Sequence, residues 1–140
     1  MIRNQNFQES LFLKTKRTME EVPFWKLIGC EVETIDSEVS RIVLNINENI
    51  HLNASSLVHG GVYASLLDNV MGLSAKAISQ TRVVTTNLNI HFLSNTDKGK
   101  IIATGKVIYQ SKSAFATQGE VRDQAGNLLA HATANFLALK

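Results

Sequence analysis

The chain has 140 residues, 44% of them hydrophobic, which is enough for one domain with a buried core and excludes a disordered chain. Lysine and arginine total 14 against 12 acidic residues, and this formal charge of +2 is too small to indicate a nucleic-acid-binding protein. The single cysteine, Cys30, excludes an internal disulfide and a cysteine metal cluster, and it is typical of a reducing compartment.

Residues 1–21 are expected to form a helical segment ahead of the main domain, residues 22–140. The stretch from Met1 to Ser10 is polar and lacks the apolar run of a secretory signal, so a cytoplasmic location is expected. Between residues 7 and 20, apolar residues recur at helical spacing among charged ones, which predicts an amphipathic helix that caps the fold. Pro23 should end this helix, and the apolar run after it should pack in the core or line a pocket.

Residues 30–47 alternate between apolar and polar side chains, which predicts an antiparallel hairpin with its turn at Asp36-Ser37-Glu38. Cys30, at its start, is expected in the core rather than as a nucleophile. The polar loop from residue 47 to 58 delivers the chain to the next helix, and such loops often carry site residues. His51, within this loop, is expected to face solvent.

The next predicted element is a helix over residues 62–78, which contain no proline and have apolar side chains on every side. A helix of this kind is expected to be buried on all sides. At about 1.5 Å per residue it is roughly 26 Å long, which is too short for a membrane span. Asp68 lies in its middle beside Leu67 and Val70, and a carboxylate buried there is usually either paired or functional.

Two adjacent glycines, Gly60 and Gly61, follow His59 at the entrance of this helix. Glycine costs conformational entropy, so the pair serves either to turn the chain into the helix or to bring bare backbone close to a ligand. The free N–H groups of a first helical turn suit an oxygen that gains negative charge during a reaction. The spacing alone leaves both interpretations open.

Gly60 and Asp68 are eight residues apart, which corresponds to about 12 Å along one helix. A general base must lie within about 3 Å of the proton that it takes, and an oxyanion donor at a similar distance from its oxygen. If both residues serve one reaction, they must come from two copies of the helix. We therefore expect a two-fold dimer with antiparallel helices and two equivalent sites.

Four segments with a period of two follow the helix, separated by turns and without helical crossovers, which indicates an antiparallel sheet. In residues 83–93 the alternation places Val84 on the apolar face toward the helix, and Thr85 and His91 on the polar face. The alanines of residues 128–136 should let the sheet approach the helix. The prediction is an α+β fold in which about six antiparallel strands curl around one long buried helix. His91 and His131 have no neighbours at metal-ligand spacing, so no metal site is expected.

The run Asn-Ala-Ser-Ser-Leu-Val-His-Gly-Gly from Asn53 to Gly61, with Asp68 nine residues after His59, resembles the core motif of hotdog-fold acyl-CoA thioesterases of the phenylacetyl-CoA (PaaI-like) type. Residues 86–94 and 126–136 also resemble strands of that family, and the likeness covers roughly residues 22–138. It implies the hotdog fold, a homodimer or homotetramer, and hydrolysis of an acyl- or arylacyl-CoA to the free acid and CoA without a cofactor.

The resemblance also implies roles for single residues. Gly60 would supply the N–H that polarises the thioester carbonyl, with His59 supporting the turn and Gly61 contacting the substrate. Asn53 would hold the attacking water or the thioester, and Asp68 of the partner subunit would act as general base or nucleophile.

Thr85 falls where relatives often carry a hydroxyl beside the acid, but on the polar strand face it would need a bulge or a subunit interface to reach Asp68. An aspartate at position 68, where other branches carry glutamate, implies the aspartate branch. Lys112, one of several lysines near the loops of the sheet, is expected to meet the phosphates of CoA.

Two other functions remain alternatives. A non-catalytic acyl-CoA binding or sensing protein on the same fold would usually carry a separate effector segment, and the 140 residues show none. An enoyl-CoA hydratase is similar in fold, but that group carries an Asp five residues before the His of its motif, where this chain has Ala54. Neither a nucleic acid nor a membrane is expected as a partner.

Overall fold

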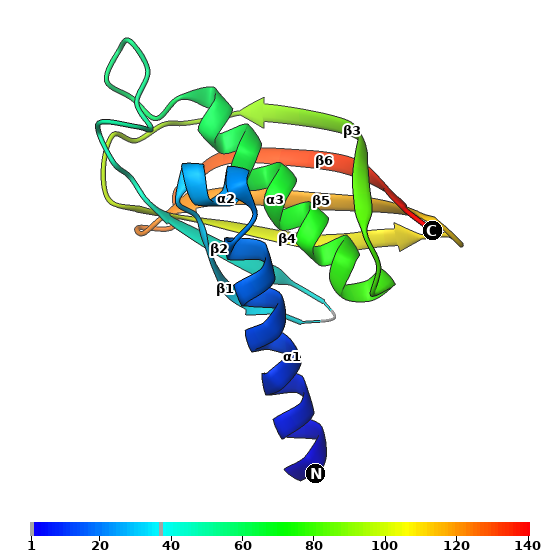
Figure 1. The fold of residues 1–140 in the computed structure, drawn as a ribbon. Helices are drawn as coiled ribbons and strands as arrows, with labels where there is room; N and C mark the ends of the chain where they lie inside the picture. Colours follow the sequence, from blue (N-terminus) through cyan, green and yellow to red (C-terminus); the bar gives the residue numbers. More distant parts are fainter. Residues whose placement is uncertain (1, 37) are drawn as a thin grey trace.

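The computed structural model describes residues 2–36 and 38–140, and within them it holds three helices and six strands (Figure 1). The helices are α1 (Ile2–Glu20), α2 (Pro23–Ile28) and α3 (Gly60–Ser79). The strands are β1 (Glu31–Ile35), β2 (Ser40–Asn45), β3 (Val83–Phe92), β4 (Lys100–Gln110), β5 (Ala114–Asp123) and β6 (Leu128–Ala138). Ser37, in the expected turn between β1 and β2, lies outside the described residues.

The strands form one antiparallel sheet in the order β1-β2-β4-β5-β6-β3, with α3 lying across it (Figure 1). The expected architecture, a curved sheet of six strands against one long helix, is confirmed. The predicted central helix over residues 62–78 is also confirmed, two residues longer at the start and one at the end. None of the described helices is long and apolar enough to cross a membrane.

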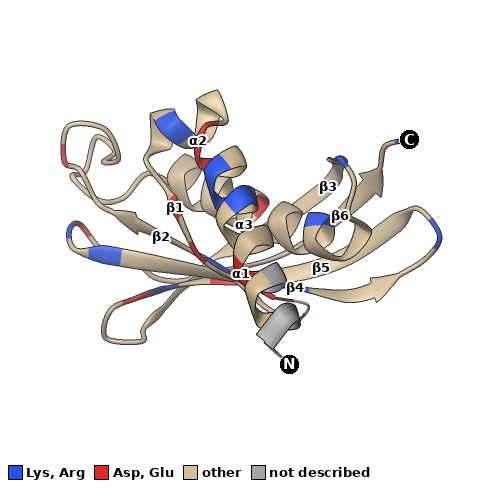
Figure 2. Ribbon diagram, turned by 60° about the horizontal axis from the view of Figure 1, so that its bottom comes forward, with Lys and Arg blue, Asp and Glu red and all other residues tan. Residues whose placement is uncertain are grey.

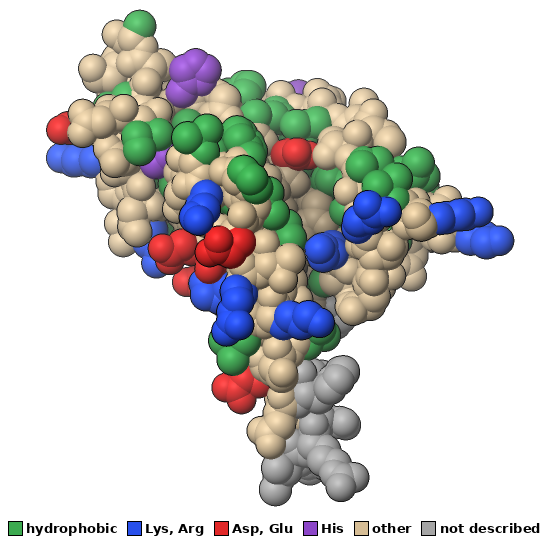
Figure 3. Space-filling model, viewed as in Figure 1, with side chains coloured by type: hydrophobic (Ala, Val, Ile, Leu, Met, Phe, Trp, Pro, Cys, Tyr) green, Lys and Arg blue, Asp and Glu red, His purple; other side chains and the backbone are tan. Residues whose placement is uncertain are grey.

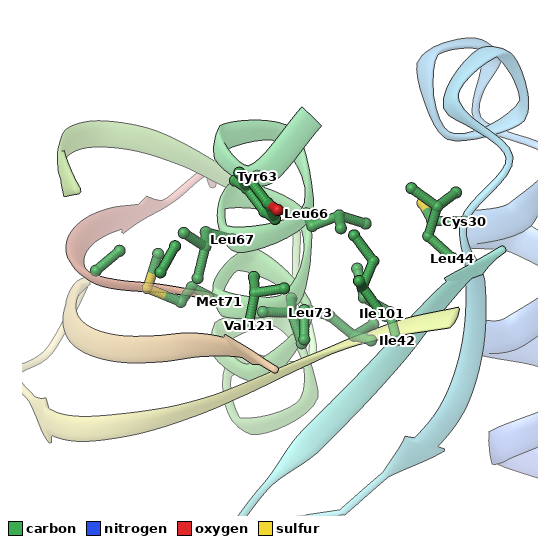
Figure 4. Close-up of a cluster of buried hydrophobic side chains, with 14 of the residues drawn as sticks. Cys30, Ile42, Leu44, Tyr63, Leu66, Leu67, Met71, Leu73, Ile101 and Val121 are labelled. Atoms are coloured by element: carbon green, nitrogen blue, oxygen red, sulfur yellow. The ribbon is translucent and has the colours of Figure 1, made fainter. Parts of the chain in front are cut away.

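The side of α3 toward the sheet forms the middle of the core (Figure 4). There, Leu66, Leu67 and Met71 lie among side chains of the strands, including Ile101 and Val121. Helix residues turned the other way, among them Gly61 and Asp68, are exposed or only half-buried. The expectation of burial on all sides is therefore wrong for a single chain, because the sheet covers one face of the helix.

Two glycines allow the helix to approach the sheet. Gly105 of β4 and Gly119 of β5 lie directly opposite each other, and both face α3. A Cβ atom at Gly105 would lie 3.0 Å from the backbone of Val70, and one at Gly119 would lie 3.1 Å from Cγ of Met71. The alanines of β6 are buried, as expected if they let the sheet approach the helix. The close approach of α3 to the sheet also depends on Gly105 and Gly119.

Helix α1 differs from the expectation of a helix that caps the fold. It starts at residue 2, and its N-terminal end stands away from the sheet (Figure 1). Only its C-terminal part packs against the body, where Phe12 and Met19 contact the core. Pro23 starts α2 instead of only ending α1, as its fixed φ allows at a first helical position.

The two edges of the sheet differ in how their backbone groups are satisfied. At the β1 edge, the N–H of Val32 donates to Oε1 of Glu20 at 2.9 Å, and its carbonyl accepts from Nζ of Lys16 at 3.0 Å. Lys16 and Glu20 of α1 also form an ion pair with each other. Strand β3, at the other edge, is ten residues long and pairs only with β6 among the described residues.

Candidate functional site

The start of α3 presents one backbone donor that has no partner. His59 is the N-cap of the helix, and its Nδ1 accepts from the N–H of Gly61 at 2.8 Å. The carbonyl of His59 accepts from the N–H of Val62 at 2.9 Å. Within the described residues, the N–H of Gly60 makes no hydrogen bond. This N–H lies at the positive end of the helix dipole and is free to donate to an oxygen.

The loop before the helix holds Asn53 with its side-chain amide group available. Oδ1 of Asn53 accepts from the N–H groups of Ser55 at 2.8 Å and Leu57 at 3.1 Å, which fixes the turn. The Nδ2 group has no hydrogen-bond partner among the described residues and remains a donor. Leu52 and Val58 pair across the loop, so Asn53 sits on a small, well-tied hairpin.

The expectation that His51 faces solvent is wrong. Its side chain is 2% exposed, and both ring nitrogens are bonded. Nδ1 accepts from the N–H of Asn47 at 2.9 Å, while Nε2 lies 2.7 Å from the carbonyl oxygen of Ile28. With one nitrogen accepting, the other carries the hydrogen, so the neutral ring ties the loop to α2. His51 is therefore a structural residue.

Asp68 lies on the half-exposed side of α3 and contacts Thr85. Oγ1 of Thr85 donates to Oδ1 of Asp68 at 2.7 Å. Oδ2 of Asp68 has no hydrogen-bond partner among the described residues. The expected burial of this carboxylate is not seen in the single chain, in which it is half-buried. One oxygen is held, and the other is free to take a proton.

A β-bulge in β3 brings Thr85 to Asp68. Thr85 lies opposite Phe136, whereas Asn87 lies opposite Asn135, so Thr86 is the extra residue. The bulge turns Thr85 to the helix side of the sheet. Of the two ways by which Thr85 was expected to reach Asp68, a bulge or a subunit interface, the bulge is confirmed. By the same shift, Val84 points outward and is 41% exposed, so its expected place on the inner face is wrong.

Cys30 and the two strand histidines are not brought to this site. Cys30 is 3% exposed, and burial raises the pKa of its thiol to about 11, so the expected core position is confirmed. His91 and His131 lie opposite each other on the outer side of the sheet. Lys112 lies exposed in the turn between β4 and β5. The described residues contain no group of three metal-binding side chains.

The free N–H of Gly60 and the carboxylate of Asp68 stand on one continuous helix, about 12 Å apart along its axis. A cleft of about 490 Å³ between α1, β1 and the last turns of α3 includes neither residue. One chain therefore carries two separated features of a candidate site: a free backbone N–H at the start of α3 and a hydroxyl-bound carboxylate in its middle.

Three residues of the surrounding structure were missed by sequence reasoning. Phe92 lies beside Gly60, Asn95 bonds the carbonyl of Val58, and Tyr63 in the first turn of α3 bonds Asn95. An aromatic residue on a buried helix and an asparagine in a turn have common structural explanations, so no pattern in the sequence singles them out.

Comparison with known proteins identifies the family of the chain. The thioesterase superfamily pattern matches residues 56–130, which contain His59, Gly60, Asp68 and Thr85. The medium/long-chain acyl-CoA thioesterase YigI of Salmonella typhimurium is 23% identical over 146 residues, covering 93% of this chain and 94% of that protein.

Solved structures show the same fold. The PaaI protein from the phenylacetic acid degradation operon of E. coli is 21% identical, with a TM-score of 0.81, and 89% of each chain is covered. Thioesterase superfamily member 2 of zebra fish is 21% identical, with a TM-score of 0.80, covering 90% of this chain and 94% of that one.

Proposed function

The chain belongs to the thioesterase superfamily, and from this premise we propose that it hydrolyses the thioester of an acyl- or arylacyl-CoA to the free acid and CoA. The observation that carries the proposal is the unpaired N–H of Gly60, left free because His59 caps Gly61 instead. A preorganised donor of this kind stabilises the negative charge that a thioester oxygen gains when water attacks. We further propose that the chain belongs to the aspartate branch of the PaaI-like proteins, because its helix carries Asp68 where other branches carry glutamate.

In the proposed mechanism, Gly60 donates its N–H to the thioester oxygen, and Oδ2 of Asp68 takes a proton from water. The oxygen of that water forms a bond to the carbonyl carbon, while Thr85 keeps Oδ1 of Asp68 in place. The C–S bond then breaks, and the CoA thiolate leaves and recovers the proton. Because a thiolate is a good leaving group, the carboxylate and the oxyanion donor suffice for this chemistry.

The remaining site residues bind the substrate in this proposal. The free Nδ2 of Asn53 donates to the water or to the thioester, and Gly61 keeps the helix entrance open to the substrate. Lys112, exposed in its turn, binds a phosphate of CoA.

In the same proposal, residues 22–140 form the thioesterase domain, and residues 1–21 are an added helical segment. The buried free thiol of Cys30 suits a reducing compartment such as the cytoplasm.

We propose a homodimer in which each site takes Asn53 and Gly60 from one subunit and Asp68 from the other. The separation along α3 supports it, because one carbonyl group cannot reach both residues. The long bare edge of β3 supports it too, since such an edge invites pairing with another chain. Exposed hydrophobic side chains gather on the face that carries α2 and α3 (Figure 3), and Phe92 and Leu93 at the end of β3 are 57% and 56% exposed.

A hydrolysis assay over a panel of acyl-CoA thioesters, read by release of free thiol, tests the proposal. We expect turnover of at least one thioester by the wild type, and a loss of roughly 10²-fold to 10⁴-fold in Asp68→Asn, the usual scale for a positioned base. Asp97→Asn, in an exposed turn, is the matched control and should keep wild-type activity.

Full activity of a folded Asp68→Asn variant would remove Asp68 from the mechanism. Tight binding of an acyl-CoA by the wild type without any hydrolysis would favour the alternative function, a non-catalytic acyl-CoA binding or sensing protein. Basic and acidic residues mix around α1, α2 and the β1–β2 side of the sheet, whereas basic residues alone mark the opposite end, at the turn between β4 and β5 (Figure 2).

A further inference from the structure

The chain entering α3 is held by the loop that follows β3. Val58, two residues before Gly60, is fully buried. Its N–H donates to the carbonyl of Thr96 at 2.9 Å, and its carbonyl accepts from Nδ2 of Asn95 at 3.2 Å. Both backbone groups of Val58 are therefore tied to two consecutive residues of this loop.

Asn95 is in turn held by the first turn of α3. Its Oδ1 accepts from the hydroxyl of Tyr63 at 2.6 Å and from the N–H of Thr96 at 2.8 Å. With Oδ1 accepting twice, only Nδ2 can donate to Val58, so the amide has one consistent orientation. Tyr63 is 1% exposed, so its hydroxyl needs a partner inside the protein, and Asn95 accepts its hydrogen bond.

Phe92 completes the contacts around Gly60. Its ring lies 3.4 Å from the place where a Cβ atom of Gly60 would stand, and it packs on Tyr63 with ring centroids 6.5 Å apart. The peptide that carries the N–H of Gly60 also carries the carbonyl of His59, which is bonded to Val62. Phe92 thus packs beside this peptide, while Asn95, held by Tyr63, fixes Val58 just before it, and the N–H of Gly60 stays open.

We propose that Tyr63 and Asn95 are positioning residues that aim the Gly60 N–H at the thioester oxygen. This inference rests on the proposed thioesterase activity. Neither residue touches the substrate; they act through Val58 and the peptide before Gly60. The effect is expected to be large, because an oxyanion donor works by being held in place beforehand, and a misplacement of about 1 Å can cost roughly 10²-fold in rate.

The test compares Asn95→Ala and Tyr63→Phe with the wild type on the best thioester of the panel. We expect kcat to fall roughly 10-fold to 100-fold in Asn95→Ala and less in Tyr63→Phe, with KM changed by less than about twofold. Asn95→Asp keeps the oxygen that accepts from Tyr63 but lacks the donor to Val58, so it should behave like Asn95→Ala.

Thr117→Val is the matched control. Thr117 is 1% exposed and donates to the carbonyl of Ala134 at 2.8 Å, so its loss removes a buried hydroxyl without touching Val58 or Gly60. Urea unfolding should show a loss of stability in this variant, with kcat unchanged. A merely structural role of Asn95 would give the same result for Asn95→Ala.

Ligand binding gives a second readout. A non-hydrolysable ketone analogue of acyl-CoA presents a carbonyl to Gly60, whereas CoA alone does not. The wild type should bind the ketone more tightly than CoA, and Asn95→Ala should lose this preference while binding CoA equally well. Folded Asn95→Ala and Tyr63→Phe variants with wild-type kcat and an unchanged preference would overturn the inference.

Failure of the proposed function can be told apart from failure of this inference. If the wild type hydrolyses no thioester, the backbone amide signal of Gly60 in a ¹⁵N NMR spectrum still reports its geometry. A shifted signal in Asn95→Ala, but not in Thr117→Val, supports the positioning, because the chemical shift of an amide follows its surroundings. An unmoved signal in both variants contradicts it.

Discussion

At the scale of single residues, the hydroxyl of Thr85 controls which oxygen of Asp68 is free. Thr85→Val removes the 2.7 Å hydrogen bond and leaves Oδ1 without a partner. We expect kcat to fall about 10-fold, because the carboxylate is no longer held in one rotamer, with little change in KM. Thr85→Ser keeps the hydroxyl and should retain most of the activity. Equal activity in Thr85→Val and the wild type would show that the bulge of β3 has no catalytic role.

Cys30 should make the stability of the protein depend on pH. Burial raises the pKa of its thiol from 9.0 to about 11, so above pH 9 the unfolded chain releases this proton before the folded chain does. The free energy of unfolding should therefore fall by about 2 kcal/mol between pH 9 and pH 11. Burial also raises the pKa of Tyr63, which adds a fall of the same sign.

Urea unfolding of the wild type and Cys30→Ala at several pH values checks this prediction. The alanine variant should be less stable at pH 8, but its curve should fall less steeply toward pH 11. If the free energy of unfolding falls equally with pH in both proteins, the pKa of the thiol is not raised in the folded chain, and the prediction is wrong.

The main candidate residues of the site could be proposed from the sequence because they stand at fixed spacings around a helix start. A histidine before two glycines, with an aspartate eight residues after the first of them, is a local pattern, and the helix holds it in register. Tyr63 and Asn95 could not be predicted, because their contact joins residues 32 positions apart, and the rest of α3 and the whole of β3 lie between them.

At the scale of elements, the long helix and the alternation of the strands could be predicted from the sequence, but the register of β3 could not. Thr85 and Thr86 are the same residue type, so moving the alternation by one position leaves the sequence pattern almost unchanged. The bulge exchanges the faces of Thr85 and Val84. Only pairing with β6 decides between the two registers, and that pairing is a tertiary contact.

The packing of α3 on the sheet should depend strongly on Gly105. In Gly105→Ala, the new methyl group would lie 3.0 Å from the backbone of Val70, which cannot move without shifting the helix. We expect a loss of about 1–3 kcal/mol in the free energy of unfolding, the usual cost of overpacking. Urea unfolding measures it. Lys106→Ala, at the adjacent exposed position, should change stability by less than about 0.5 kcal/mol, and an equal effect in both would contradict the packing argument.

At the scale of the whole molecule, shared sites can be tested by mixing inactive subunits. Asn53→Ala and Asp68→Ala should each be inactive alone. After subunit exchange, each mixed dimer has one site with both substitutions and one with none. A 1:1 mixture should therefore recover about a quarter of the wild-type activity.

Refolding the two variants together and measuring thiol release checks this expectation. Each variant refolded alone is the control and should stay inactive. Exchanged subunits without recovered activity would show that Asn53 and Asp68 do not complete each other's sites.

The difference between the two edges of the sheet limits how many chains can assemble. In the proposed dimer, the β3 strands of the two subunits pair, so neither subunit keeps an unpaired β3 edge. The outer edges are then the two β1 strands, where Val32 already has its backbone bonded to Glu20 and Lys16 of α1. Another chain could pair with β1 only by displacing these side chains. Assembly by strand pairing is therefore expected to stop at the dimer and not to continue into a fibre.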